Sequence, residues 1–212
     1  MKTSIALKTL LGAGALTLPL LAFAESNVQT GAATASPGAT AHVDFAIVIP
    51  KILYLRVGSG SAYASGTLAS ANTIDLITFS PAAGTVGNGI PVAGTGGDLT
   101  GGVETAAIVS NSGNVTLNAT ATGALSDGNG DTIPFTQITT AATTLTSGTQ
   151  LPAPVLTNGT SSNVVLTAPA TKLIVEDAKW TYSYANAANV PAGTYGGANV
   201  NNGRVTYTAT MP

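Results

Sequence analysis

The sequence predicts an all-β protein, an immunoglobulin-like antiparallel β-sandwich, on three observations. Short segments rich in Val, Ile and Thr recur along the chain, separated by clusters of Gly, Asn, Ser and Pro. After residue 24, no segment combines apolar spacing of 3.6 residues with a cap and a stop, which excludes long helices. The chain is 44% hydrophobic and only 8% charged, so it can bury a core.

The first 24 residues have the pattern of a signal peptide. Lys2 and Lys8 give a positive start, residues 9–21 are apolar, and Ala22-Phe23-Ala24 supplies small residues at the cleavage point. The apolar run is too short for a stable membrane span. We therefore expect cleavage after Ala24, export from the cytoplasm, and no membrane span in the mature protein.

A flexible leader is expected over residues 25–40, where Val28 is the only large apolar side chain. One sandwich domain should follow over residues 41–212. Its first segment alternates strongly, because every second side chain is large and apolar over one short stretch: Val43, Phe45, Ile47 and Ile49. Pro50 then interrupts the pattern, because proline cannot donate to a strand ladder.

The remaining strands follow from short apolar runs between turn residues. In the clearest case, Val115 and Leu117 alternate with polar residues, as expected for a half-buried antiparallel strand. Residues 111–114 predict a hairpin loop before that strand, and the Gly-rich residues 81–102 predict a surface loop. Strands are expected at residues 52–57, 73–79, 103–110, 114–122, 132–139, 163–168, 172–176, 179–185 and 203–211.

Catalytic chemistry has few candidate residues here. The chain has one histidine, His42, and no cysteine, so a nucleophile with its base or a His/Cys metal cage is hard to build. After the signal peptide, five basic residues face nine acidic ones, which argues against a nucleic-acid partner. We expect no enzyme activity, no cofactor and no metal.

Two acidic segments have alternative interpretations. Asp127, Asn129 and Asp131 copy the first ligands of a calcium loop, but Thr132 and Ile138 occupy the positions of its required Gly and Glu. A tight turn is the favoured interpretation, although a weak calcium site of another geometry stays open. Glu176 and Asp177 point to opposite faces of an extended strand and are expected to mark a bulge or a break.

An aromatic row is expected where Trp180, Tyr182 and Tyr184 alternate with Thr181 and Ser183. Such a row can form a platform that stacks against sugars, but inside a sandwich it more often belongs to the core. The core interpretation is favoured, and a glycan-binding surface is the alternative.

Three segments carry a family resemblance: VDFAIVIPKILYLRVGSG after the signal peptide, VSNSGNVTLNATATGALSDGNGDTIPF in the centre, and VPAGTYGGANVNNGRVTYTATMP at the end. Together they resemble bacterial fimbrial subunits, most of all the cysteine-free pilins of the alpha, or colonisation-factor, class of chaperone–usher fimbriae. In those pilins a strand after the leader, a central hairpin and a Gly-x-Tyr motif before the last strand occur in this order.

The resemblance implies a structural subunit of a cell-surface fimbria, exported through the periplasm and active in adhesion. It also implies an incomplete sandwich, completed by a donor strand from the next subunit. The last strand would pair with a periplasmic chaperone and deliver the subunit to an outer-membrane usher. On this chain it would present one face made of Val205, Tyr207, Ala209 and Met211.

This sequence departs from the pilin pattern in its leader, where residues 26–40 lack alternating large apolar side chains. Either the donor is the segment from Val43 to Ile49, or the protein does not polymerise in this way. The alternative function is a monomeric periplasmic or surface module that binds glycan.

Overall fold

The computed structural model describes four parts of the chain: residues 26–34, 38–58, 68–146 and 148–212. The chain divides into two units, residues 1–49 and 50–212. The predicted signal peptide lies outside the described residues, and its cleavage stays a prediction.

In the first unit, none of the described residues belongs to a helix or a strand. The segment expected to be either a donor or a first strand is not a strand in this chain. Extended backbone gains its hydrogen bonds only from a neighbouring strand, so alternation alone does not make a ladder. The alternating side chains are exposed: Val43 by 71%, Phe45 by 89%, Ile47 by 86% and Ile49 by 75%.

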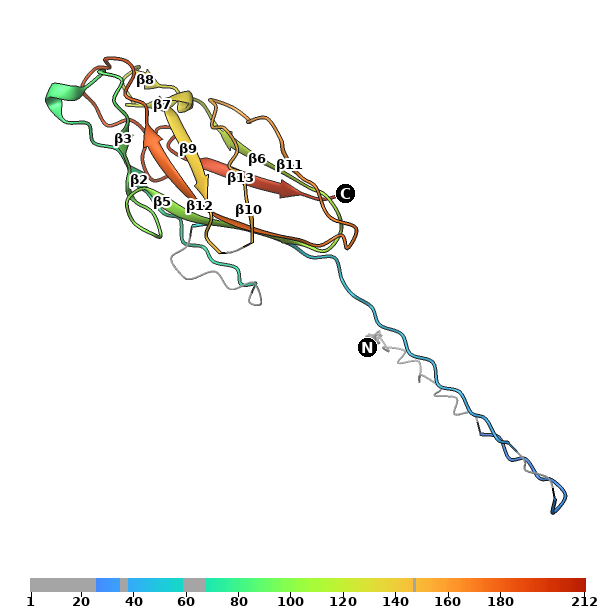
Figure 1. Ribbon diagram of the computed structural model, residues 1–212. Helices are drawn as coiled ribbons and strands as arrows, with labels where there is room; N and C mark the ends of the chain where they lie inside the picture. The colour runs from blue at the N-terminus through green and yellow to red at the C-terminus, as the bar shows by residue number, and fades with distance from the viewer. Residues whose placement is uncertain (1–25, 35–37, 59–67, 147) are drawn as a thin grey trace, which may run out of the picture. The chain divides into compact units, whose positions relative to one another are not determined.

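The second unit is all-β, as the sequence predicts, and its sheets form a sandwich (Figure 1). Its described residues hold two short 3₁₀ helices, η1 (Ala83–Thr85) and η2 (Phe135–Gln137). The strands are β1 (Leu53–Val57), β2 (Ile77–Thr78), β3 (Val92–Ala93), β4 (Thr95–Gly96), β5 (Val103–Ser110), β6 (Val115–Ala121), β7 (Leu125–Ser126), β8 (Thr132–Ile133), β9 (Ile138–Thr143), β10 (Thr149–Gln150), β11 (Val164–Leu166), β12 (Ile174–Tyr184) and β13 (Val205–Thr210).

The larger sheet is built around β5 and β12, which run antiparallel with Ile108 opposite Glu176 and Val103 opposite Thr181. The first strand, β1, pairs with the other side of β5 and forms one edge of the sheet. Beyond β12 lie β9 and β3, both antiparallel to it, and β10, which is parallel.

The smaller sheet has the order β11-β6-β13, with all pairs antiparallel. The alternation in β6 works as predicted, since Val115 and Leu117 are fully buried while Thr116 and Asn118 are partly exposed. The core lies between the two sheets. Its members include buried side chains from four strands: Ala106, Ile108, Val115, Leu117, Leu166 and Trp180.

The hairpin expected at residues 111–114 is wrong. The loop carries the chain from β5 in the larger sheet to β6 in the smaller one. Gly and Asn mark a reversal, but they do not say whether it stays within a sheet or crosses between layers. The side chain of Asn111 fixes this corner, because its Oδ1 accepts from the Ile52 N–H at 2.8 Å and its Nδ2 donates to the Pro50 carbonyl at 2.8 Å.

The break expected at Glu176 and Asp177 is also wrong, because β12 runs without interruption for 11 residues. Asp177 is 4% exposed on this strand, yet its carboxylate has partners. The Thr146 N–H donates to Oδ1 at 3.1 Å and the Thr146 hydroxyl donates to Oδ2 at 2.7 Å. These hydrogen bonds offset the desolvation of the charge and keep the strand regular.

The Gly-rich segment 81–102 has more structure than a surface loop, since it contains η1, β3 and β4. Asn186, which is fully buried, organises one end of it. Its Nδ2 donates to the Thr85 carbonyl at 2.7 Å, and its Oδ1 accepts from the Gly87 N–H at 2.8 Å.

Candidate functional site

The candidate site is a groove between the free edges of the two sheets. Strand β1 is the edge of the larger sheet and β13 is the edge of the smaller one, and the two lie against each other across the side of the sandwich. No other strand pairs with the free side of either within the described parts of the chain. Two neighbouring edges with unpaired backbone groups are a template for a further strand.

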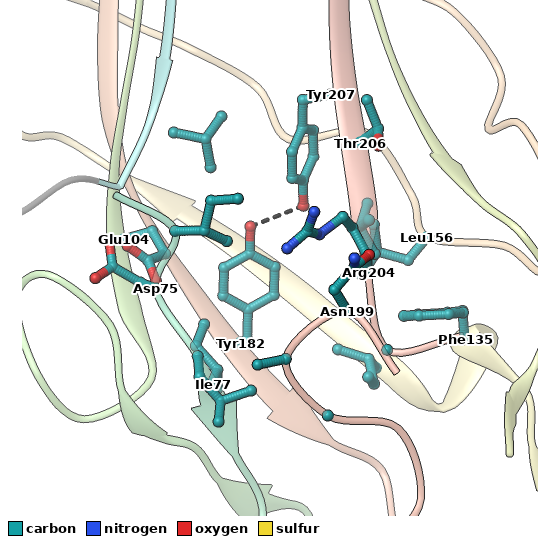
Figure 2. Close-up of a pocket in the computed structure, with 18 of the residues that line it drawn as sticks. Asp75, Ile77, Glu104, Phe135, Leu156, Tyr182, Asn199, Arg204, Thr206 and Tyr207 are labelled. Atoms are coloured by element: carbon teal, nitrogen blue, oxygen red, sulfur yellow. Dashed lines mark hydrogen bonds between the residues drawn. The ribbon is translucent and has the colours of Figure 1, made fainter. Parts of the chain in front are cut away.

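The β1–β13 groove has a volume of about 560 Å³ and is drawn in Figure 2. Most of the side chains along it are apolar or aromatic, and those of the two edges pack against the core while remaining only partly buried. Water therefore reaches apolar surface that a complete sandwich would cover. The apolar and aromatic lining is Leu55, Val57, Ile74, Leu76, Ile77, Phe79, Phe135, Ile138, Leu156, Tyr182, Val205 and Tyr207.

A pair of tyrosines crosses the groove and joins the two sheets. The hydroxyls of Tyr182 on β12 and Tyr207 on β13 hydrogen-bond at 2.8 Å. Burial raises the pKa of Tyr207 to about 12 and also raises that of Tyr182, so both rings stay neutral at physiological pH. The ring of Tyr207 also packs on Trp180 with centroids 5.3 Å apart, which ties the edge strand to the core.

One end of the groove is acidic. Glu104 lies on β5 in the row of side chains that faces the core, and it is only 5% exposed. Its Oε2 accepts a hydrogen bond from the Asp98 N–H at 3.2 Å, and its carboxyl group also hydrogen-bonds with Asp75. Oxygens of Asp75 and Glu104 both lie 2.5 Å from the point where Gly58 would carry a Cβ. The two carboxyl groups thus meet at the end of β1.

Burial is the main cause that raises the pKa of Glu104 to about 8, and the charges of Asp75 and Asp98 raise it further. The hydrogen bond from the Asp98 N–H acts in the opposite direction. Near neutral pH this carboxyl group is therefore mostly protonated. It can then donate a hydrogen bond within the apolar groove instead of burying a charge.

The nearby cations differ in their partners. Arg56 on β1 lies 3.5 Å from the Asp98 carboxylate, in a pair that is almost fully buried, and its Nε donates to the Gly58 carbonyl at 2.9 Å. Arg204, just before β13, also lines the groove, and in Figure 2 the Tyr182–Tyr207 pair lies between Arg204 and Glu104. Arg204 makes no hydrogen bond or ion pair with any residue that the structure describes.

The final strand presents the predicted face. The side chains of its odd-numbered residues pack against the core, and the threonines between them are exposed. Beyond the strand, the Lys51 ammonium donates to the Pro212 carbonyl at 3.0 Å, so the start of β1 lies beside the end of β13. The core-facing residues are Val205, Tyr207 and Ala209 on the strand and Met211 just after it.

The other candidate sites from the sequence have structural roles. Asp127 forms the predicted turn, since its Oδ1 accepts from the N–H groups of Asn129 and Asp131, and these bonds lower its pKa. Trp180 and Tyr182 are 0% and 6% exposed, so the aromatic row is core and offers no platform to a sugar. Within the described residues, no three acidic or histidine side chains gather in a way that could hold a metal.

Sequence reasoning missed Glu104 and Asp75. The available signal was the alternation of the strand, in which every second residue shares a face. Glu104 shares its face with Ala106 and Ile108, so an acidic residue stands in a core-facing row. Asp75 gave no comparable signal, because only the folded chain brings its segment to the end of β1.

No helix in the described part of the chain is long and apolar enough to cross a membrane. Comparison with known protein families, curated proteins and solved structures gives no match to this chain.

Proposed function

We propose that this chain is a secreted structural subunit of a bacterial surface filament, which assembles by strand addition between copies. The β1–β13 groove of one copy would receive an extended apolar strand from the next, closing an otherwise incomplete immunoglobulin-like sandwich. The observation that carries this proposal is the groove itself, where two unpaired edges flank partly exposed core side chains.

The donor in this proposal is the segment from Val43 to Ile49. Its alternating side chains are 71% to 89% exposed, which is costly in water and unusual outside an interaction surface. Burial of each such side chain stabilises by about 1.5–3 kcal/mol. An alternating segment can place one row of side chains in the groove while its backbone pairs with the free edge of β1 or of β13.

The β13 edge would be covered before assembly as well as after it. Its core-facing row and its unpaired backbone are what a periplasmic chaperone could bind by pairing a strand of its own. An outer-membrane usher would then exchange that strand for the donor of the next copy. Adhesion would be a property of the assembled filament.

Ile47→Asp in the exported protein tests the donor. Because Ile47 is 86% exposed and lies outside the sandwich unit, the variant should keep its fold by circular dichroism. It should fail to form multimers in sedimentation velocity, because an aspartate would be buried in the groove. Val28→Asp is the matched control, since Val28 is 87% exposed but lies outside the donor segment.

The donor assignment would be wrong if Ile47→Asp assembled as the unsubstituted protein does. If the unsubstituted protein also stayed monomeric in sedimentation velocity, the proposed function itself would be wrong. Immunogold electron microscopy of intact cells adds the cellular test, because a filament subunit should label fibres on the surface.

A further inference from the structure

The acidic end of the groove is unusual for a surface that takes up apolar side chains. Glu104 stands in the core-facing row of β5 and already has little contact with water. A strand laid over the groove would remove the remaining water from its carboxyl group. Covering an ionised carboxylate with apolar side chains is strongly unfavourable unless the charge is paired or neutralised.

The charged and titratable groups around Glu104 come from β1, β12, β13 and the segments before β2 and β5. Asp98 precedes β5 and is held by Arg56 of β1, while Asp75, from the segment before β2, adds a second negative charge. From β12 and β13, Tyr182 and Tyr207 face the groove as neutral hydroxyls bonded to each other. Among the lining residues, the remaining cation is Arg204.

We propose that filling of the β1–β13 groove by an apolar strand is coupled to proton uptake at Glu104. Assembly is then favoured at pH values where this carboxyl group holds its proton and weakened at higher pH. This coupling rests on the proposed function, because it requires that the groove bind a strand. It adds a regulatory property to that site, namely control by ambient pH.

The direction follows from proton linkage. In the open groove the pKa of Glu104 is about 8, and further burial in the filled groove raises it more. Below pH 8 both states hold the proton, so affinity does not change with pH. Above pH 8, Glu104 loses its proton in the open groove but keeps it in the filled groove. Binding of the strand must then take up a proton, so affinity falls by up to about tenfold per pH unit.

An ion pair with Arg204 is the alternative to protonation of Glu104. If its guanidinium moved to Glu104 when the groove filled, an ion pair would replace the proton and binding would not depend on pH. Arg204 is exposed in the open groove, so its charge is hydrated and would have to lose that hydration. We therefore expect protonation to be the less costly solution.

The test uses the full exported chain carrying Ile47→Asp, which disables its own donor and leaves the groove open. The probe is a synthetic peptide with the sequence of residues 43–49, VDFAIVI, with blocked ends and Ser-Gly extensions. Asp44 is its only ionisable group, so the peptide does not titrate between pH 6.5 and 9.5. Fluorescence anisotropy gives the Kd across this range.

We expect binding that is constant up to about pH 8 and about 30-fold weaker at pH 9.5. Adding Glu104→Gln should abolish this pH dependence, because the neutral amide can still accept from the Asp98 N–H. Adding Glu176→Gln is the matched control. Burial also raises the pKa of the Glu176 carboxyl group, but Glu176 does not line the groove, so the pH dependence should persist.

Calorimetry provides a measurement without Glu104→Gln, in case that substitution disturbs folding. Titrations at pH 8.5 in buffers of different ionisation enthalpy should report net uptake of protons on peptide binding. Binding with the same Kd at every pH and no proton uptake would overturn the coupling alone. Absence of peptide binding at every pH would overturn the proposed function together with the coupling.

Discussion

Gly58 is the residue on which the acidic end of the groove depends. It ends the β1 segment with φ +73°, a conformation that side chains with a Cβ rarely adopt. Its missing side chain leaves the space in which Glu104 and Asp75 approach each other. The approach of these two carboxyl groups thus requires a residue without a Cβ at this position.

Gly58→Ala should destabilise the sandwich by at least about 1–2 kcal/mol, the usual cost of a left-handed backbone for a residue with a Cβ. Contact with both carboxyl groups should add to that cost. Gly84→Ala is the control, because nothing lies within 4 Å of its Cβ position and its φ is not positive. Urea denaturation followed by circular dichroism measures both, and equal midpoints would contradict the strained geometry.

At the scale of single elements, strands were easiest to predict where alternation and turn residues agreed. The strand expected at 103–110 matches β5, because its ends are set by a Gly pair and by the Asn-Ser-Gly turn. The 111–114 corner was mispredicted, because local turn chemistry does not encode which sheet the next strand joins. Short pairings such as β2 with β4 depend on tertiary contact and left no pattern.

The uninterrupted β12 was not predictable from adjacent acidic residues, because the partners of Asp177 come from Thr146, 31 residues earlier. Those contacts hold the β9–β10 connection onto the outer face of the central strand. The continuity of β12 matters to the site, since Tyr182 near its end reaches the groove.

Asp177→Ala should therefore destabilise the protein by about 1–3 kcal/mol, because the N–H and hydroxyl of Thr146 lose their acceptor. Glu176→Ala, on the neighbouring residue, is the matched control, since Glu176 is only partly buried and its side chain makes no hydrogen bond to the described residues. Thermal melts of both variants give the comparison. A melting temperature that falls by the same amount in each would show that the Thr146 contacts contribute nothing.

At the scale of the whole molecule, the sequence predicted the sandwich, because composition and alternation alone exclude helices and favour two packed sheets. It also predicted the apolar row on the core-facing side of the last strand. It could not predict that the edges β1 and β13 meet, because their neighbourhood is set by the crossing at Asn111 and by the pairing of β13 with β6.

The contact between Lys51 and the Pro212 carbonyl has a consequence for engineering, because it places residue 212 beside the start of β1, one of the two edges that flank the groove. A second copy of residues 41–49, joined after Pro212 through a short Gly-Asn linker, could turn back and fill the groove within one chain. A short flexible linker provides an effective concentration of about 1 mM. If the peptide's Kd were 100-fold below that value, the fusion would gain about 2.7 kcal/mol of stability.

Such a fusion should sediment as a monomer and melt at a higher temperature than the parent chain. The same fusion with an aspartate at the second copy of Ile47 should gain nothing. Equal melting temperatures for the two fusions would contradict the proposed occupant of the groove. Because the end of β13 lies beside the start of β1, such a fusion gives a monomeric form with a filled groove, in which the groove chemistry can be studied without polymerisation.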